Sequence, residues 1–228
     1  YNNGTPIDLS FNYQNYNSIN NLVGYWGMNE GSGDSLIAKS VRTGVDLDGS
    51  NDYIPVVGSL SAGTYNFLTS TLKYSVSIWF KFDNHTTNAS QVLLANNYTS
   101  NSGANVGIQV WYDNRNGHAT KAIRVNSWAG TSVSTNTANA ISDNNWHHLV
   151  VTSSGASGTL SVYLDGNPTP IATASLGSTS DTAPQQDLAI VGRVVSSSVN
   201  SPHGGLLDDV AIWNETLPAN EVVEIYNN

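Results

Sequence analysis

Cysteine is absent from this chain of 228 residues. Its absence excludes disulfides, thiol catalysis and cysteine-based zinc sites, and a chain of this length can bury a sufficient core without disulfides. Charge is also scarce, because only 11% of the residues are charged and the net charge is −9. The eight Lys and Arg residues are scattered along the sequence. The sequence therefore lacks the cationic footprint of a nucleic-acid-binding protein, and its acidic balance favours cation binding and solubility.

Long apolar runs are also missing. No run approaches the 18 residues that a membrane-spanning helix needs, so we expect no membrane insertion. The first residues lack the charged region and the apolar region that make up a signal peptide. The same absence is expected if the chain is a piece excised from a longer protein. Five N-x-S/T triplets occur, but with Asn so abundant chance matches are expected, and glycosylation is the weaker interpretation. They begin at Asn3, Asn84, Asn88, Asn97 and Asn214.

What is present is alternation of apolar and polar residues. In "KYSVSIWFKFD" the residues from Tyr74 to Phe82 alternate strictly, which predicts a strand with one face in the core. The segments "NNWHHLVVTSS" and "GTLSVYLDGNP" alternate in the same way, and the second ends in the turn dipeptide Asp165-Gly166. Further strands are predicted at 22–29, 52–57, 91–95, 106–112, 121–126, 188–192 and 206–213.

Many short strands separated by Gly, Asn and Ser clusters indicate an all-β, two-sheet antiparallel sandwich or jelly roll. One short helix is predicted at the C-terminal end, in "ETLPANEVVEIYNN", where Pro218 fits the first helical turn. Leu217, Val222 and Ile225 would share the face that docks on the sandwich.

Three stretches carry a family likeness. They are "LVGYWGMNEGSGDSL" with "VDLDGSNDYIPV", "YSVSIWFKFD" with "NNWHHLVVTSSGASGTLSVYLDGNP", and "HGGLLDDVAIWNETLPANEVVEIYN". In this order they resemble the laminin-G-like, concanavalin-A-like lectin/glucanase jelly-roll domains found in phage structural proteins and multi-domain adhesins. The resemblance runs from residue 22 to residue 226. It implies two antiparallel sheets packed face to face, one of them concave. Residues 84–145 follow the family pattern poorly, as expected of variable loops and peripheral strands.

Catalytic motifs are missing. Glycosidase chemistry needs two carboxyl groups flanking the scissile bond, but the four Glu residues form no alternating pair on one strand, and Asp208 and Asp209 are adjacent. No G-x-S-x-G elbow occurs. Alternation sends His147 and His148 to opposite sides of the sheet, which does not suit a shared zinc ion. His148 is interpreted as a packed core histidine, and His147 is left open. We therefore predict that the chain is not an enzyme.

Calcium is the metal that the acidic residues favour. "DLDGSNDY" resembles part of an EF-hand loop, but Ser59 stands where the closing Glu belongs. The family resemblance implies a structural calcium held by Asp208 of the final strand and by contributors near Glu30 and Asp48. Alternation predicts that Asp208 shares the core face of Val210 and Ile212, where a carboxylate needs a partner. The alternatives are that backbone N–H groups satisfy Asp208, or that the acidic residues occupy turns.

A sugar-binding surface is predicted in "QVWYDNRNGHATKAIRVNSW", where aromatic rings stand among hydrogen-bonding groups. Its candidate ligand-binding residues are Trp111, Tyr112, Asp113, Arg115, His118 and Trp128. The alternative is that Trp111 and Trp128 are ordinary sheet residues. Three further tryptophans occupy framework positions and are expected in the core, namely Trp26, Trp146 and Trp213.

The sequence as a whole predicts a non-catalytic recognition module, carbohydrate-binding or adhesive. It would be displayed on a larger extracellular or virion (phage tail or structural) protein, next to other domains of that parent chain. The alternatives are a structural spacer and a polysaccharide-cleaving glycoside hydrolase. Tyr-Asn-Asn stands at both ends of the chain, which suggests one period of an array. On this interpretation residues 1–21 are a linker, and residues 22–228 form the jelly-roll domain.

Overall fold

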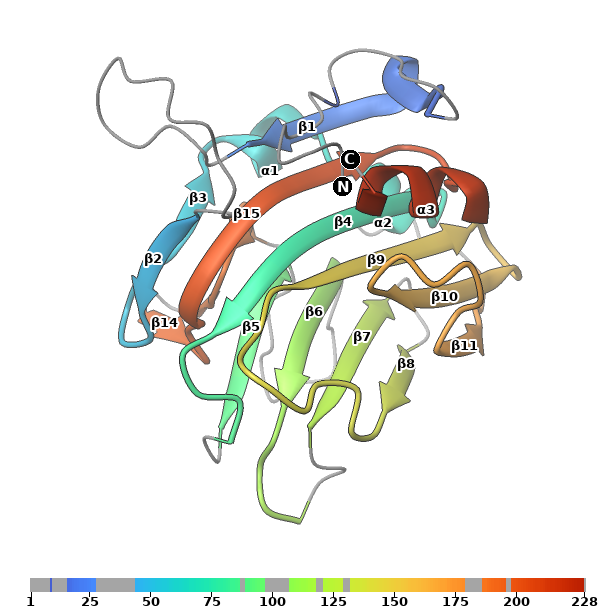
Figure 1. The fold of residues 1–228 in the computed structure, drawn as a ribbon. Coiled ribbons are helices and arrows are strands. Elements are labelled where there is room, and N and C mark those ends of the chain that lie inside the picture. The colour runs from blue at the N-terminus through green and yellow to red at the C-terminus, as the bar shows by residue number, and fades with distance from the viewer. Residues whose placement is uncertain are drawn as a thin grey trace, which may run out of the picture.

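Fifteen strands and a few short helices make up the part of the chain that the structure, a computed structural model, describes. The described residues are 9, 16–27, 44–86, 89–96, 107–117, 121–128, 132–178, 186–195 and 198–227. The strands form two antiparallel sheets that face each other, which confirms the predicted sandwich (Figure 1). The helical segments are the 3-10 helix Ser18–Asn21, α1 (Ser59–Ala62), α2 (Phe67–Ser70) and α3 (Ala219–Asn227).

One sheet has seven strands and the other has six. The seven-stranded sheet runs β1 (Leu22–Trp26), β15 (Gly204–Trp213), β4 (Lys73–Phe82), β9 (His147–Ser154), β10 (Thr159–Leu164) and β11 (Ala172–Ser175), and β2 (Val45–Asp48) also pairs with β15. The six-stranded sheet runs β3 (Ile54–Val56), β12 (Leu188–Ile190), β5 (Ser90–Ala95), β6 (Gly107–Asp113), β7 (Ala122–Trp128) and β8 (Ser132–Thr137). A separate hairpin joins β13 (Arg193–Val195) and β14 (Ser198–Asn200).

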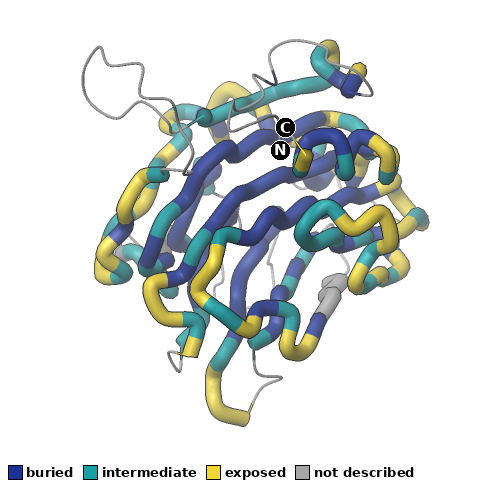
Figure 2. The backbone as a smooth tube through the Cα atoms, in the orientation of Figure 1, coloured by how far each residue is buried: buried dark blue, intermediate teal, exposed yellow. Residues whose placement is uncertain are grey.

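The core lies between the two sheets and follows the predicted alternation. In β4 the residues from Tyr74 to Phe82 that were expected inside are all in the main core cluster. Their neighbours Ser75, Ser77 and Trp79 lie on the opposite, outer face of the seven-stranded sheet. Figure 2 shows the central strands buried along their length, with exposure concentrated in the connecting loops.

The alternation of β15 breaks at Asp209. This residue has a positive φ of 42°, and the pairing with β4 shifts register between Asp208 and Ala211. Because a β-bulge adds one residue to its strand, the faces change sides at that point. Val210 and Ile212 are in the core as predicted, but Asp208 pairs with Trp79 and so lies on the outer face. The expectation that Asp208 shares their core face is therefore wrong.

Helix α3 lies over one end of the outer face of the seven-stranded sheet, near the ends of β4 and β9 (Figure 1). The predicted helix and its apolar face are confirmed, since Leu217, Val222 and Ile225 pack with Trp213 of β15 in a second buried cluster. Near the end of the helix the ring of Tyr226 stacks on Trp79 of β4, with 5.4 Å between the ring centroids.

Two residues of the predicted linker belong to the same buried cluster. Tyr16 is fully buried, and its hydroxyl donates a hydrogen bond to the carbonyl of Leu9 at 3.0 Å. The same hydroxyl accepts a hydrogen bond from the indole of Trp213 at 3.1 Å. Residues 9 and 16 are thus packed against the domain. The boundary proposed near residue 22 stays a prediction.

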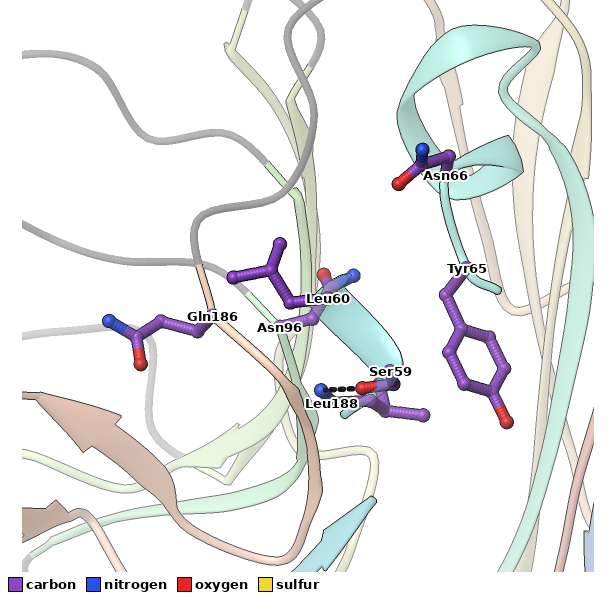
Figure 3. Close-up of a pocket in the computed structure, with 7 residues that line it drawn as sticks. All are labelled: Ser59, Leu60, Tyr65, Asn66, Asn96, Gln186 and Leu188. Atoms are coloured by element: carbon purple, nitrogen blue, oxygen red, sulfur yellow. Dashed lines mark hydrogen bonds between the residues drawn. The ribbon is translucent and has the colours of Figure 1, made fainter. Parts of the chain in front are cut away.

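Asp187 fastens helix α1 to the six-stranded sheet. The Asp187 carboxylate accepts hydrogen bonds from the backbone N–H groups of Leu60 at 2.7 Å and Gly58 at 3.0 Å. The bond from Leu60 is the main reason that the pKa of Asp187 is lowered. The Ser59 hydroxyl in turn accepts a hydrogen bond from Leu188 N–H at the wall of a small cavity (Figure 3). At about 10 Å³ this cavity has room for no more than a water molecule, so it is not a ligand site.

Candidate ligand-binding site

Strand β6 divides the predicted sugar-binding residues between two faces. Trp111 and Asp113 lie on the outer face of the six-stranded sheet, whereas the intervening Tyr112 points into the core. Tyr112 is fully buried and packs on Phe82, with 4.5 Å between the ring centroids. Its hydroxyl donates a hydrogen bond to the carbonyl of His85. The prediction that Tyr112 contacts a ligand is therefore wrong, because strict alternation separates it from its two neighbours.

Asp113 is the centre of an ionic cluster at the end of β6. Its side chain is fully buried and receives a two-pronged interaction from Arg115, with Nε at 2.8 Å from Oδ1 and a terminal nitrogen at 3.0 Å from Oδ2. Arg124, on the neighbouring strand β7, places its Nε 3.0 Å from Oδ2. Forked guanidinium–carboxylate contacts of this kind hold both partners in a defined orientation.

The electrostatics of the cluster follow from this geometry. Burial raises the pKa of Asp113, but the hydrogen bonds and charge of Arg115, together with the charge of Arg124, outweigh burial and hold the pKa below its usual value. The hydrogen bond to Asp113 correspondingly raises the pKa of Arg115. Asp113 and Arg115 are therefore both charged at neutral pH.

Cross-strand pairing extends this cluster along the outer face. Trp111 of β6 lies directly opposite Arg124 of β7, and one step further Gln109 lies opposite Asn126. Trp111 is only 8% exposed and packs with Val92 and Ala95 of β5. The accessible part of this face includes Arg124, whose side chain is 19% exposed, and Arg115, at 44%. We call Gln109, Trp111, Asp113, Arg115, Arg124 and Asn126 the β6–β7 patch.

The remaining predicted sugar-binding residues are not placed. His118 lies outside the described residues, and of Trp128 only the backbone, at the end of β7, is described. The prediction that they contact a ligand stays a prediction.

Arg193 is a further cation of this region that sequence reasoning missed. It begins β13, which packs beside β5, and its side chain is partly buried. Burial, and secondarily the charge of Arg115, lower the pKa of Arg193. Nothing in the local sequence "VGRVVSS" signals this placement, because residues 193 and 115 are far apart in the chain.

A cavity of about 240 Å³ opens at the rim of the sandwich, where β2, β4, β5 and β15 come together. Its lining includes the side chains of Asp48, Asp83, Asn84 and Gln91. The cavity adjoins the end of the β6–β7 patch, since Ala89 in its wall accepts a hydrogen bond from Asn114 N–H at 3.0 Å. Its polar lining suits hydroxyl-bearing ligands and small cations.

The predicted calcium ligands do not come together in the described part of the chain. Asp48 pairs with Gly204 on β15, four residues before Asp208, and four residues of a strand span about 13 Å. Asp48 also stabilises the turn that follows it, because its carboxylate accepts a hydrogen bond from Ser50 N–H at 2.7 Å. Glu30 lies outside the described residues. Within the described residues, no group of three metal-binding side chains is found. The two described aspartates do not fit one ion, and calcium stays a prediction.

The arrangement around His148 resembles part of a hydrolase site but is closed to substrate. Ser77 Oγ lies 2.8 Å from His148 Nε2, and both residues are buried to about 99%. The rings of Trp79 and Tyr226 stack over the histidine, at 4.8 and 5.9 Å between centroids. His148 is thus a packed histidine, as predicted. His147, on the other face, is held between Asp165 at 2.9 Å and Asp143 at 3.1 Å.

Comparisons with known proteins place this fold in a family. The model of the Laminin_G_3 family, described as the concanavalin A-like lectin/glucanases superfamily, matches residues 48–223. This match confirms the laminin-G-like resemblance. A search of curated protein sequences finds no significant relative. In the described residues no helix is long and apolar enough to cross a bilayer.

Several solved structures share the fold at low sequence identity. The CBM40 domain of the Ruminococcus gnavus IT-sialidase superposes with a TM-score of 0.64 at 13% identity, covering 81% of this chain and 97% of that one. Domain 4 of AbnA, an extracellular GH43 arabinanase of Geobacillus stearothermophilus, gives 0.55 at 18% identity, with 89% and 87% covered. The leech intramolecular trans-sialidase gives 0.63 at 10% identity, covering 90% of this chain but 28% of that one.

Proposed function

Because the chain belongs to the concanavalin A-like lectin/glucanase superfamily, we propose that it is a non-catalytic carbohydrate-binding module. Its glycan would lie on the outer face of the six-stranded sheet, over the β6–β7 patch. In support, the similar Ruminococcus gnavus domain was solved with α2,3-sialyllactose, and the Geobacillus domain with arabinotriose.

The observation that carries this proposal is the fixed, charged cluster of Asp113, Arg115 and Arg124 beside Trp111. The buried Asp113 carboxylate holds the Arg115 guanidinium in place through two hydrogen bonds, so the remaining N–H groups of Arg115 are oriented before a ligand arrives. Arg124 makes an ion pair with the same carboxylate. Preorganised donors of this kind bind sugar hydroxyls. The outer face of the other sheet is less suitable, because α3 packs over β4 and β9 there.

A non-catalytic role is favoured over the glycosidase alternative by the placement of the carboxylates. Glycoside hydrolysis needs two carboxyl groups on either side of the bond. On the β6–β7 patch the single described carboxylate, Asp113, is engaged by Arg115 and Arg124. Glu221 and Glu224 belong to α3, on the other sheet. Release of reducing ends from any bound glycan would contradict this part of the proposal.

Arg115→Ala should weaken glycan binding about tenfold or more, because it removes oriented donors from the most exposed part of the patch. Because the variant leaves the buried Asp113 carboxylate with Arg124 alone, some loss of stability is also expected, and thermal melting would show that the variant is folded at the temperature of the titration. A glycan array would first identify a ligand for the wild type, and calorimetric titration of that ligand would then give the two affinities.

Lys73→Ala is the matched control, because it removes one exposed cation from β4 in the other sheet. Equal affinities of the wild type and both variants would contradict the placement of the site. Failure of the wild type to bind any glycan on the array would favour the spacer alternative.

The setting of the module is also part of the proposal. We propose that it is displayed on an extracellular or virion (phage tail or structural) surface, within a longer adhesive chain. Support comes from the resemblance to domains of phage structural proteins and multi-domain adhesins. The sequence that flanks this chain in its parent protein would test it.

A further inference from the structure

We propose that the cavity of about 240 Å³ at the rim of the sandwich binds the terminal residue of a neutral glycan and excludes acidic sugars. We call it the rim cavity. This inference rests on the proposed function, because the rim cavity adjoins the β6–β7 patch and would take one ring of the glycan that lies there. It assigns ligand-binding roles to Asp83, Asn84 and Gln91, which neither the family match nor the sequence pattern indicates.

A buried amide supplies the first group. Gln91 of β5 is only 6% exposed, and its side chain lines the rim cavity. Its Oε1 accepts a hydrogen bond at 3.0 Å from the N–H of Gly204, at the start of β15 in the other sheet. Because a backbone N–H can only donate, this bond fixes which atom of the amide is the oxygen, and the NH₂ group has no partner among the described residues. A buried donor without a partner is costly unless a ligand accepts its hydrogen bond.

Two exposed side chains at the mouth of the cavity supply the other groups. Asn84 Oδ1 accepts hydrogen bonds from Thr86, from its N–H at 2.9 Å and its hydroxyl at 2.6 Å, which leaves the NH₂ group of Asn84 for another partner. The Asp83 carboxylate accepts no hydrogen bond from the described residues, but the Asp83 backbone is fixed. Its N–H donates to the carbonyl of Gly204 at 3.1 Å, and its carbonyl accepts from the side chain of Asn144 at 3.2 Å. These groups are thus held in place before a ligand arrives.

The mixture of donors and acceptors favours a sugar over a cation. A calcium ion is bound by oxygen atoms, but the amide oxygens of Asn84 and Gln91 are already engaged, so both side chains offer donors. A sugar hydroxyl can donate to the Asp83 carboxylate and also accept from an amide. At about 240 Å³ the cavity is smaller than the ~300–1,000 Å³ of pockets for drug-sized ligands, which suits a single ring at the end of a chain.

Charge determines which sugars fit. Asp48 and Asp83 both line the rim cavity, and its described lining includes no Lys, Arg or His. The carboxylate of an acidic sugar would therefore meet two negative charges with no cation to offset them, and like charges at close range repel. We expect the terminal residue in the rim cavity to be neutral.

The test uses the whole chain and an array of neutral oligosaccharides that end in a hexose, each beside the same oligosaccharide with that hexose oxidised to the uronic acid. The wild type should bind the neutral member of at least one pair about tenfold more tightly. Asp83→Ala should weaken binding of that member about tenfold, because a sugar hydroxyl loses its charged acceptor. The variant should fold normally, since Asp83 is exposed and its bonds to Gly204 and Asn144 are made by the backbone. Thermal melting would confirm this.

Two further variants sharpen the test. Asp46→Ala is the matched control, because it removes an exposed carboxylate from β2 that does not line the rim cavity, and it should bind as the wild type does. Asp83→Asn keeps the shape of the side chain and removes its charge. It should reduce the preference for the neutral member, because one of the two repelling charges is gone.

The outcomes separate this inference from the proposed function. If Asp83→Ala binds as tightly as the wild type while Arg115→Ala binds weakly, the patch stands and the role of the rim cavity is overturned. Equal or tighter binding of the oxidised member by the wild type would overturn the exclusion of acidic sugars. Loss of binding in EDTA would show that a metal ion mediates it, and would overturn direct binding by the amides. No binding to any probe would overturn both proposals.

Discussion

Trp213→Ala is expected to lower the free energy of unfolding by about 3–5 kcal/mol, the range for truncating a large buried aromatic side chain. Trp213 is fully buried between β15 and α3. Its ring meets that of Tyr16 edge-on, at 6.3 Å between centroids and an interplanar angle of 73°. The substitution removes this contact together with the packing of Val222 and Ile225, and the rigid sheet beneath cannot collapse to fill the space. Urea denaturation of both proteins would measure the difference.

Two further variants show whether the effect comes from this cluster. Tyr16→Phe keeps the ring but leaves the indole N–H of Trp213 without its acceptor, so a loss of about 1–3 kcal/mol is expected. Val57→Ala changes a side chain that is 83% exposed and should stay within about 0.5 kcal/mol of the wild type. If Trp213→Ala costs less than about 1 kcal/mol, neither α3 nor Tyr16 is packed on β15 as described.

The second large effect is a loss of stability in acid that originates at His203. This side chain is fully buried against Phe82, and burial lowers its pKa from the usual 6.5 to about 4. Between these two pH values the unfolded chain binds a proton that the folded protein does not. Stability therefore rises with pH across this window, and roughly 3 kcal/mol is lost as the pH falls from 6.5 to 4. Free energies of unfolding measured at several pH values would show the slope.

His203→Gln should remove this slope, because glutamine keeps a donor for the carbonyl of Leu206 but does not titrate. His147 supplies the control, since its behaviour has the opposite sign. Burial lowers the pKa of His147, but Asp165 and Asp143 outweigh burial and leave it raised. Its contribution is full below pH 6.5 and is lost as the pH rises through the raised pKa. His147→Gln should therefore leave the acid window unchanged. If His203→Gln keeps the acid slope, His203 is not its origin.

The fold was predictable where apolar residues alternate. Strand β4 and helix α3 show their buried faces directly in the sequence, and both are observed as predicted. Strands β8 (Ser132–Thr137) and β11 (Ala172–Ser175) were missed because their Ser- and Thr-rich segments show no apolar face. The four-residue helices α1 and α2 are too short to show a helical period.

The candidate site was predictable only in part, for two physical reasons. Alternation in β6 places Tyr112 in the core and Trp111 and Asp113 on the outer face, so the three residues cannot share one binding surface. Other features depend on long-range structure. The bulge at Asp209 occurs at a non-glycine residue with positive φ, which the sequence does not mark, and it moved Asp208 to the outer face. Arg193 comes near the end of β5 because β13 packs beside that strand.

The most direct test of the proposed site is a titration of the ¹⁵N-labelled protein with a glycan identified on the array, followed through the six tryptophan indole N–H signals. The signal of Trp111, assigned with the variant Trp111→Phe, should shift as the ligand is added, because Trp111 lies opposite Arg124 on the outer face of the six-stranded sheet. The signals of Trp79 and Trp213 should stay in place, because both lie on the other sheet beside α3. Shifts at Trp79 or Trp213 without a shift at Trp111 would contradict glycan binding on the β6–β7 patch.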